Sequence, residues 1–373
     1  MKALSIIQKI KIPGLSIIDR YIIRKFLGTF FYSISLLILI VIIFDLSEKI
    51  DDFLTKQAPL DAIIFDYYFN FIPFFINLFS SLFTFISVIF FTSRLAARTE
   101  IIAILGGGIS FRRLLRPYMI AATLLVVLTI YLANFLIPIT NKQLREFEKK
   151  YYKNPQQSRD LNIHMQIDPG VFVYVETWDK EKKQGTRFTM ERFEDKKLVY
   201  KIIADKIAWD TIKSEWRMSN FYSKRFLANG NQKLETGSSK DTLMTLHPND
   251  FMVDVEDIKT MNFNQLNDFI AREKLKGSKN VRQYEVEKHK RFAFPISAII
   301  LTLIGVALSS RKIRGGIGMH LGLGIAITFS YILFMQISTQ FAVFGTLTPI
   351  VAVWLPNFLF GILAFYLIRI APK

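Results

Sequence analysis

Chemically distinctive residues gather at 94–117, a stretch that reads RLAARTEIIAILGGGISFRRLLRP. Arg98 and Glu100 precede an apolar run beginning at Ile101, and three glycines separate this run from a second group of arginines. A short helix with an acid beside an apolar face is suited to docking into a groove on another protein. An ordinary loop whose arginines reach towards lipid head groups would carry the same residue types. From chemistry alone, both interpretations remain open.

Residue types that usually carry catalysis or bind metals are scarce. The chain of 373 residues has no cysteine, which excludes disulfides, iron–sulfur clusters and cysteine-based zinc sites. Its four histidines lie far apart in sequence and form no HxxxH or HExxH pattern,. No G-x-x-x-x-G-K-[ST] motif occurs, so we expect no ATP hydrolysis through a P-loop of this chain. We therefore assign no catalytic residue, no metal site and no cofactor.

Five stretches without Asp, Glu, Lys or Arg are long enough to cross a bilayer. They cover residues 26–44, 67–93, 117–140, 292–310 and 315–368. Because a membrane-spanning helix needs about 20 apolar residues, the longest stretch is expected to form two. Six membrane spans exclude a soluble globular enzyme. The predicted spans cover about 26–46, 62–93, 117–139, 291–310, 317–340 and 349–369.

Polar and small residues inside the spans are expected to hold the helices together. Gly318 and Gly322 form a GxxxG pattern, which allows helices to approach closely,. Amide side chains within spans commonly form hydrogen bonds between helices. We expect such bonds from Asn70, Asn77, Asn134, Gln336 and Gln340.

Basic residues distinguish one side of the membrane from the other. The N-terminal segment, the loops after the second and fourth spans and the C-terminal tail hold sixteen Lys and Arg, but only Asp19 and Glu100 as acids. Short loops rich in Lys and Arg stay in the cytoplasm, so both termini are predicted to be cytoplasmic. Anionic lipids and this rule explain the net charge of +17, which therefore does not favour nucleic-acid binding,.

The segment between the third and fourth spans has a different pattern. Stretches such as GVFVYVETW and KLVYKIIADKIAWD, separated by polar turns, predict an antiparallel β-domain over about 160–260,. Helical patterns flank it at 140–158 and 263–290. Three of the chain's tryptophans, Trp178, Trp209 and Trp216, are expected in its core.

We thus predict an α-helical integral membrane protein with six transmembrane helices, three before and three after an inserted β-domain. Residues 1–139 would hold an interfacial helix at 1–25 and the first three spans. Residues 140–290 would form the β-domain with its flanking helices, and residues 291–373 the last three spans.

Four stretches, taken in order, carry a resemblance to a known family. They are DRYIIRKFLGTF (19–30) with FDLSEKIDDF (44–53), the stretch 94–117, YEVEKHKRFAFPISAIILTLIGVAL (284–308) and TPIVAVWLPNFLF (348–360). They resemble the LptF/LptG (YjgP/YjgQ) permeases, the membrane subunits of the lipopolysaccharide-exporting ABC transporter. Their order and the three-plus-three layout extend the resemblance to nearly the whole chain. The beginning and first span look slightly more like LptG.

The resemblance implies a non-catalytic subunit of the bacterial inner membrane that extracts lipopolysaccharide. ATP hydrolysis in an LptB-like ATPase dimer would drive this extraction, and a second LptF/LptG-type permease would complete the membrane part. The β-domain, a β-jellyroll in the family, would be periplasmic. It would pair by strand addition with LptC-like and LptA-like proteins, which form a bridge for the lipopolysaccharide.

The resemblance also assigns roles to residues near Glu100. This segment would be the coupling helix that sits in the ATPase. Arg98 and Glu100 would make polar contacts, Ile101 and Leu105 would fill the groove, and Gly108 would permit the turn.

Substrate contacts are implied at the outer end of the first span. Lys49 and Lys56 would pair with the phosphates of lipid A. Glu48, however, occupies a place where relatives of the LptG type carry a cation. A solvated loop position beside Asp51 explains Lys49 equally well.

Two other function classes remain as alternatives. A membrane-embedded lipid-modifying enzyme would need acids, bases or nucleophiles clustered near one face, and the sequence shows no such cluster. A secondary transporter would need charged groups at the membrane midplane beside broken helices. Pro73, Pro295 and Pro356 are suited to breaking helices, but they have no charged partners in the spans.

Overall fold

The chain folds into two compact units. The first comprises residues 1–50, 68–137 and 289–373, and the second comprises residues 51–67 and 138–288. Residues 51–67 thus group with the second unit rather than with the predicted N-terminal segment. The computed structural model describes residues 14–151, 159–179, 182–211, 213–227, 231–251, 257–278, 280–311 and 316–371.

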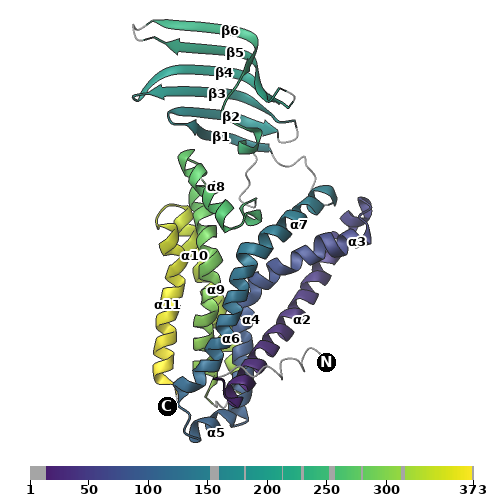
Figure 1. The fold of residues 1–373 in the computed structure, drawn as a ribbon, viewed down its shortest axis with the longest axis vertical. Coiled ribbons are helices and arrows are strands. Elements are labelled where there is room, and N and C mark those ends of the chain that lie inside the picture. The colour runs from purple at the N-terminus through teal and green to yellow at the C-terminus, as the bar shows by residue number, and fades with distance from the viewer. Residues whose placement is uncertain are drawn as a thin grey trace. The chain divides into compact units, whose positions relative to one another are not determined.

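Six helical segments of the described chain are long and apolar enough to cross a membrane. Their main helices are α2 (Ile17–Thr55), α4 (Phe69–Ala97), α6 (Phe111–Tyr131), α9 (Val281–Ser309), α10 (Gly316–Val343) and α11 (Pro349–Ile370) (Figure 1). The shorter elements are α3 (Leu60–Ala62), the π-helical turns η1 (Ile63–Tyr68) and η2 (Leu132–Leu136), α5 (Glu100–Gly106), α7 (Ile137–Tyr151) and α8 (Phe263–Leu275). The predicted fold class, six long apolar helices with an inserted antiparallel sheet, is confirmed.

The first span begins earlier than its apolar stretch. α2 is continuous over 39 residues, so residues 17–25 form its first turns and not a separate interfacial helix. No glycine or proline between Ile17 and Lys25 interrupts the backbone hydrogen bonding,. Residues 1–13, the rest of the predicted interfacial helix, lie outside the described residues.

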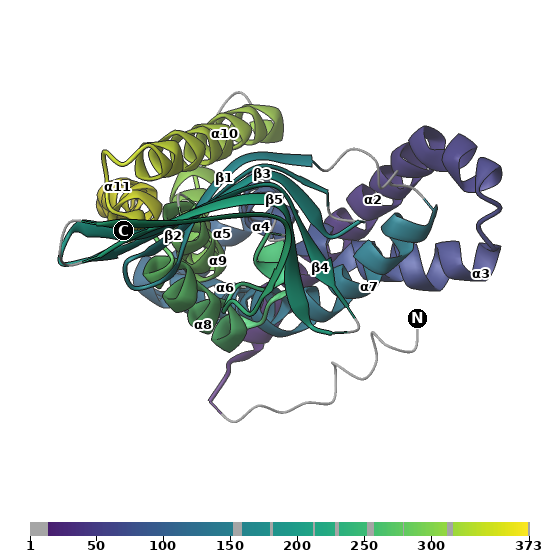
Figure 2. The same cartoon turned by 90° about the horizontal axis from the view of Figure 1, so that it is seen from above.

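The second unit contains one open antiparallel sheet (Figure 2), whose strands follow chain order from β1 to β6 (Figure 1). The strands are β1 (Arg159–Asp168), β2 (Val171–Asp179), β3 (Gln184–Glu194), β4 (Lys197–Asp210), β5 (Glu215–Phe226) and β6 (Gln232–Thr242). Alternate residues of β2 to β5 are buried on one face, where Leu246 and Phe251 from beyond β6 join them.

Tryptophans stand at the centre of the sheet's core. Trp178 and Trp216 are completely buried, and their rings pack edge to face with centroids 5.8 Å apart. The indole N–H of Trp216 donates to the carbonyl of Leu246 at 2.7 Å, which fixes the segment after β6 against the sheet. Trp209 is partly buried against the same core, so the predicted role of all three tryptophans is confirmed.

Polar side chains join three of the apolar helices. Asn357 of α11 accepts a hydrogen bond from the Tyr331 hydroxyl of α10 at 2.9 Å and donates to the Ala293 carbonyl of α9 at 2.8 Å. Both bonds are buried, where loss of a partner is costly. Asn134, which was expected to link helices, instead donates to Ile130 of its own helix.

Close helix packing in the described residues uses Gly305 and Gly324 rather than the GxxxG pair Gly318 and Gly322. A Cβ atom added at Gly324 would collide with Ile89 of α4, and one added at Gly305 would lie 2.9 Å from Val88 Cγ1. At Gly318 and Gly322, an added Cβ would meet no atom within 4 Å. Within the described chain, the GxxxG pattern therefore makes no close helix contact, and its packing role stays a prediction.

Pro356 removes a backbone donor from the interior of α11. Proline has no N–H, so the carbonyl of Ala352, four residues earlier, loses its usual helical donor. The Ser338 hydroxyl of α10 donates to this carbonyl at 2.6 Å in a buried setting. Because lipid offers no replacement partner, Ser338 compensates for the proline.

Ser338→Ala should therefore destabilise the protein by about 1 kcal/mol, the usual size of a hydrogen bond between membrane helices. Adding Pro356→Ala restores a helical N–H and should remove most of this loss. Thermal unfolding in detergent measures both effects. Ser330→Ala is the matched control, since exposed Ser330 donates to the Ala326 carbonyl of its own helix. Equal losses in Ser338→Ala and Ser330→Ala would contradict this explanation.

Candidate functional site

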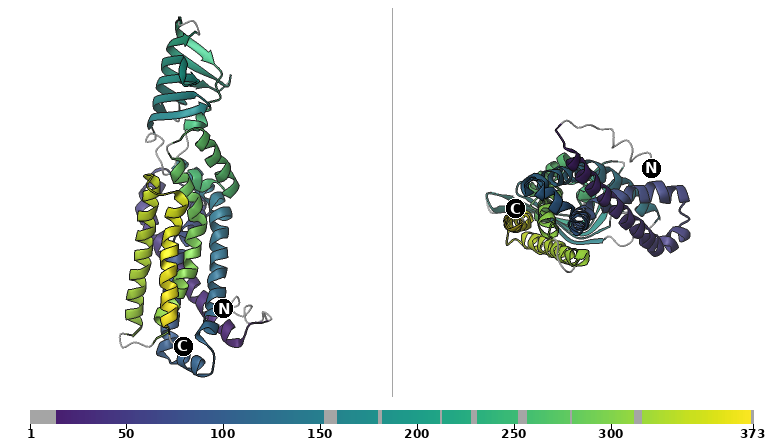
Figure 3. Two further views of the ribbon diagram at one scale, coloured as in Figure 1. Left: turned by 90° about the vertical axis from the view of Figure 1, so that its left-hand side faces the viewer. Right: turned by 90° about the horizontal axis from the view of Figure 1, so that it is seen from below.

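The chemically distinctive stretch forms a short helix between α4 and α6. α5 begins after Thr99, whose φ of 61° is unusual for a β-branched residue,. Gly107 ends the helix, and Gly108 has a φ of 86°, which glycine adopts without strain,. α5 lies at the same end of the helical unit as the start of α2 and the end of α11 (Figures 1 and 3).

The apolar residues of α5 divide between a buried and an exposed face. Ile101 is 1% exposed and belongs to the same buried cluster as Ile22, Phe26 and Phe111. Leu105 is partly buried against that cluster. Ile102 is 57% exposed and faces away from the core. The structure therefore does not fit the prediction that Ile101 fills a groove on a partner, because the chain's own core already encloses it.

The polar residues at the start of α5 differ in their surroundings. The side chain of Arg98 is exposed, whereas that of Glu100 is half-buried. The Tyr21 hydroxyl donates to Glu100 Oε2 at 3.2 Å, so α2 contacts α5 directly. Tyr21 was not among the residues expected from the sequence, since nothing in the spacing of residues 21 and 100 indicates their proximity.

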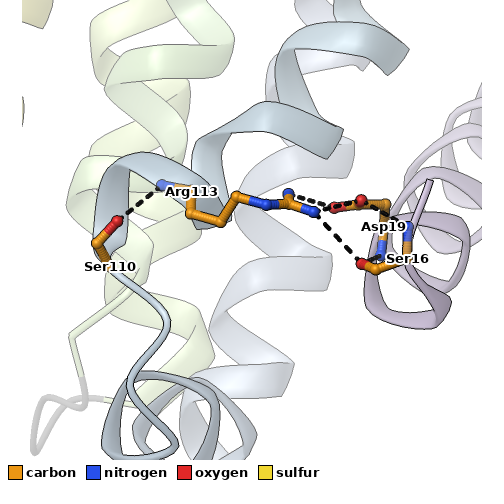
Figure 4. Close-up of polar contacts among 4 residues, drawn as sticks. All are labelled: Ser16, Asp19, Ser110 and Arg113. Atoms are coloured by element: carbon orange, nitrogen blue, oxygen red, sulfur yellow. Dashed lines mark hydrogen bonds and ion pairs between the residues drawn. The ribbon is translucent and has the colours of Figure 1, made fainter. Parts of the chain in front are cut away.

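A second polar contact joins α2 to the start of α6 (Figure 4). Two guanidinium nitrogens of Arg113 each donate to one carboxylate oxygen of Asp19, both at 2.6 Å. The Asp19 side chain is 1% exposed and that of Arg113 is 37% exposed. Such charge-assisted, bidentate hydrogen bonds are among the strongest and best oriented in proteins.

Both helix starts in this contact are capped. Asp19 Oδ2 accepts from the Ser16 backbone N–H at 2.9 Å, and Ser16 Oγ accepts from the Asp19 backbone N–H at 3.3 Å. This reciprocal pair is a capping box, and the sequence pattern Ser16-x-x-Asp19 was a signal that would have located it. Ser110 Oγ caps α6 by accepting from the Arg113 backbone N–H at 3.3 Å. One ion pair thus connects two capped helix starts.

The two lysines assigned to substrate lie in different settings. Lys49 Nζ is 2.7 Å from Asp45 Oδ1, one helical turn earlier, and the side chains are only 13% and 11% exposed. Any phosphate bound by Lys49 would therefore compete with an existing ion pair. Lys56 is partly exposed and lies immediately after the last residue of α2. Within the described residues, no group of three or more histidines and acids is placed to hold a metal ion.

Comparison with protein-family models identifies the family of this chain. The model for the lipopolysaccharide export system permease LptF/LptG matches residues 20–370, which include α5, the sheet and, apart from the first three residues of α2, the six apolar helices. The chain belongs to the LptF/LptG family. Comparison with curated proteins gives no match.

Membership of the LptF/LptG family confirms the predicted function. It decides against the two alternatives, a lipid-modifying enzyme and a secondary transporter. The protein is a multi-pass permease of the lipopolysaccharide export system and a non-catalytic membrane subunit of an ABC transporter. The family model covers LptF and LptG together, so it does not favour the LptG type over the LptF type.

The two isoleucines of α5 should respond differently to truncation. Ile101→Ala should lower the free energy of unfolding by about 2–4 kcal/mol, because it leaves a cavity in a packed core. Ile102→Ala should change it by less than about 0.5 kcal/mol, as is usual for exposed positions. Thermal unfolding of the two variants compares them directly. A larger loss for Ile102→Ala would show that α5 is rotated relative to the structure described.

Proposed function

We propose that α5 is the coupling helix through which this LptF/LptG permease binds an LptB-like ATPase dimer. The observation that carries the proposal is the division of this short helix into two faces. One face packs into the core of the permease through Ile101, and the other is exposed through Ile102. Ile102 is the main exposed apolar side chain, with Arg98 and Glu100 as polar contacts beside it. Leu105 is partly buried and would line the edge of the contact, and Gly108 permits the turn into α6.

ATP binding by the ATPase would then drive transport through α5. Closing of the ATPase dimer would displace the docked helix, and the displacement would reach the spans through their contacts with α5. A ligand shifts a conformational equilibrium only when it binds the two states differently, so α5 must remain attached to the helices that move. In this mechanism, lipopolysaccharide leaves the inner membrane as a cavity between two permeases contracts.

A second permease of the same family is proposed to complete that cavity. α2 and α10 carry large exposed apolar side chains, including Phe31 and Tyr32 on α2 and Phe329 on α10. Gly318 and Gly322 on α10 face open space within the described chain, which would allow another helix to approach closely,. These surfaces support a permease partner in addition to lipid.

Substrate contacts are proposed for the lysines at the end of α2. Lys56 is the better candidate for a lipid A phosphate, because it is partly exposed. Lys49 would contribute only when Asp45 releases it, given their 2.7 Å contact.

The sheet is proposed to pair with the β-domains of LptC-like and LptA-like proteins. β1 and β6 are the edge strands of the described sheet. The Gln166 N–H of β1 already donates to the Lys276 carbonyl at 2.8 Å, which covers part of that edge. β6, whose side chains are largely exposed, is therefore the proposed strand for edge-to-edge addition,.

The proposed orientation places α5 and both termini in the cytoplasm and the sheet in the periplasm. Because the chain has no cysteine, single cysteines can be introduced as topology markers. A thiol reagent that does not cross the inner membrane should label Ser238→Cys in spheroplasts and label Ala103→Cys only after lysis. Both positions are exposed, so burial does not explain a difference. The opposite labelling pattern would overturn the orientation.

The docking role is tested by placing a charge on the exposed face of α5. Ile102→Asp should reduce recovery of the ATPase in affinity purification by about tenfold or more, because an apolar anchor then carries an unpaired charge. Leu234→Asp is the matched control, since Leu234 is 56% exposed but lies on β6.

Glu100→Arg should also weaken ATPase binding while the protein remains in the membrane. Mass spectrometry of the purified complex identifies the ATPase, the second permease and bound lipopolysaccharide. Unchanged ATPase recovery in both α5 variants would exclude docking at α5.

A further inference from the structure

The first turns of α2 contact both ends of the segment that carries α5. Tyr21 donates to Glu100 at the start of α5, with an oxygen–oxygen distance of 3.2 Å. Asp19, two residues earlier, binds Arg113 in the first turn of α6 through two contacts of 2.6 Å. α5 is therefore connected to α2 on both sides, in addition to its chain connections to α4 and α6.

The contact between Asp19 and Arg113 is the stiffer of the two connections. It has two charge-assisted hydrogen bonds in a fixed planar geometry, whereas Tyr21 and Glu100 share one hydrogen bond,. The Asp19 side chain is 1% exposed, so water hardly competes for it. The capping box with Ser16 holds the carboxylate in place, and Arg113 Nη2 also lies 3.5 Å from Ser16 Oγ (Figure 4).

Apolar packing fills the space between these polar connections. Ile101 of α5, Ile22 and Phe26 of α2 and Phe111 of α6 belong to one buried cluster. Closely packed interiors transmit displacement because their side chains have little free volume. A displacement of α5 therefore reaches α2 through direct contacts, without passing along the length of α4 or α6.

We propose that Asp19 and Arg113 are positioning residues that make the start of α2 follow α5 when a bound ATPase changes conformation. This inference rests on the proposed docking of the ATPase at α5. It assigns the first span as a helix that the ATPase moves through α5, and the ion pair as the contact that determines how much lipopolysaccharide is exported per ATP. A purely structural role would instead stabilise the helix starts without affecting that ratio.

The test uses the complete transporter, with ATPase and both permeases, reconstituted in vesicles containing lipopolysaccharide. Arg113→Gln removes the charge that binds Asp19, and Arg112→Gln makes the same change at the neighbouring exposed position. Arg113→Gln should keep the ATPase bound but lower lipopolysaccharide exported per ATP by about tenfold, within the usual range of coupling between sites. Arg112→Gln should leave this ratio unchanged. A wild-type ratio in Arg113→Gln would overturn the inference.

A double variant separates coupling from folding. Arg113→Gln leaves the buried Asp19 carboxylate without its partner, which by itself lowers stability. Asp19→Asn together with Arg113→Gln replaces both charges by amides, and thermal unfolding should then recover towards the wild type. The inference predicts that the export ratio stays low despite this recovery. Recovery of the ratio together with stability would show that the pair acts only through folding.

The distance between α5 and α2 can be measured directly. A change in the stability of the permease alone does not alter how this distance responds to nucleotide. Spin labels at Ala103→Cys in α5 and Ile17→Cys in the exposed first turn of α2 report the separation of the two helices, and the chain has no other cysteine. In the otherwise unmodified complex, a nucleotide that closes the ATPase should leave this separation unchanged, because the helices move together. In Arg113→Gln, the separation should change. A nucleotide-dependent change without that substitution would overturn the inference.

The outcomes distinguish this inference from the docking on which it rests. If the ATPase fails to copurify with the unmodified permease, the proposed docking is wrong and the inference fails with it. If the ATPase copurifies and the export ratio is the same in every variant, docking stands and only the role of Asp19 and Arg113 is wrong.

Discussion

The lipid interior offers no hydrogen-bond partner, and this constraint determines where the permease can place its polar groups. Each of the six long helices therefore satisfies its own backbone, and the proline of α11 is tolerated where Ser338 replaces the missing donor. Asn357 makes two buried bonds to neighbouring helices. Charged side chains are largely absent from the spans, and the ion pairs described within the helical unit, Asp45–Lys49 and Asp19–Arg113, concentrate towards helix ends.

That concentration explains the arrangement around α5. The ion pair of Asp19 and Arg113 connects two capped helix starts at one end of the helical unit, and Tyr21 adds a contact to Glu100. Ile101 secures α5 against the core, which leaves Ile102 outside. α5 thus combines a fixed inner face with an accessible outer face, the combination that the proposed docking of an ATPase requires.

The spans and the sheet could be predicted, because each follows from a pattern within one segment of the sequence. The contacts between distant segments could not. Charge-free stretches located the six spans, and alternation located the sheet, because both depend on local sequence. Ile101 and Ile102 are identical in type and adjacent, so only the packing of α5 on α2 and α6 decides which is buried. The glycines at 305 and 324 pack against α4, while the more conspicuous GxxxG pattern faces outwards. The charge pattern registers Asp19 only as an acid, whereas its spacing from Ser16 indicates a helix start,.

The most direct test of the account is photo-crosslinking from α5 in membranes that contain the whole transporter. A photoreactive amino acid at position 102 should crosslink to a subunit that carries a P-loop, because this side chain faces outwards. The same group at position 101 should give no such product, since that side chain is enclosed by the permease core. Absence of the ATPase crosslink at 102, in membranes where the assembled transporter is active, would contradict the account.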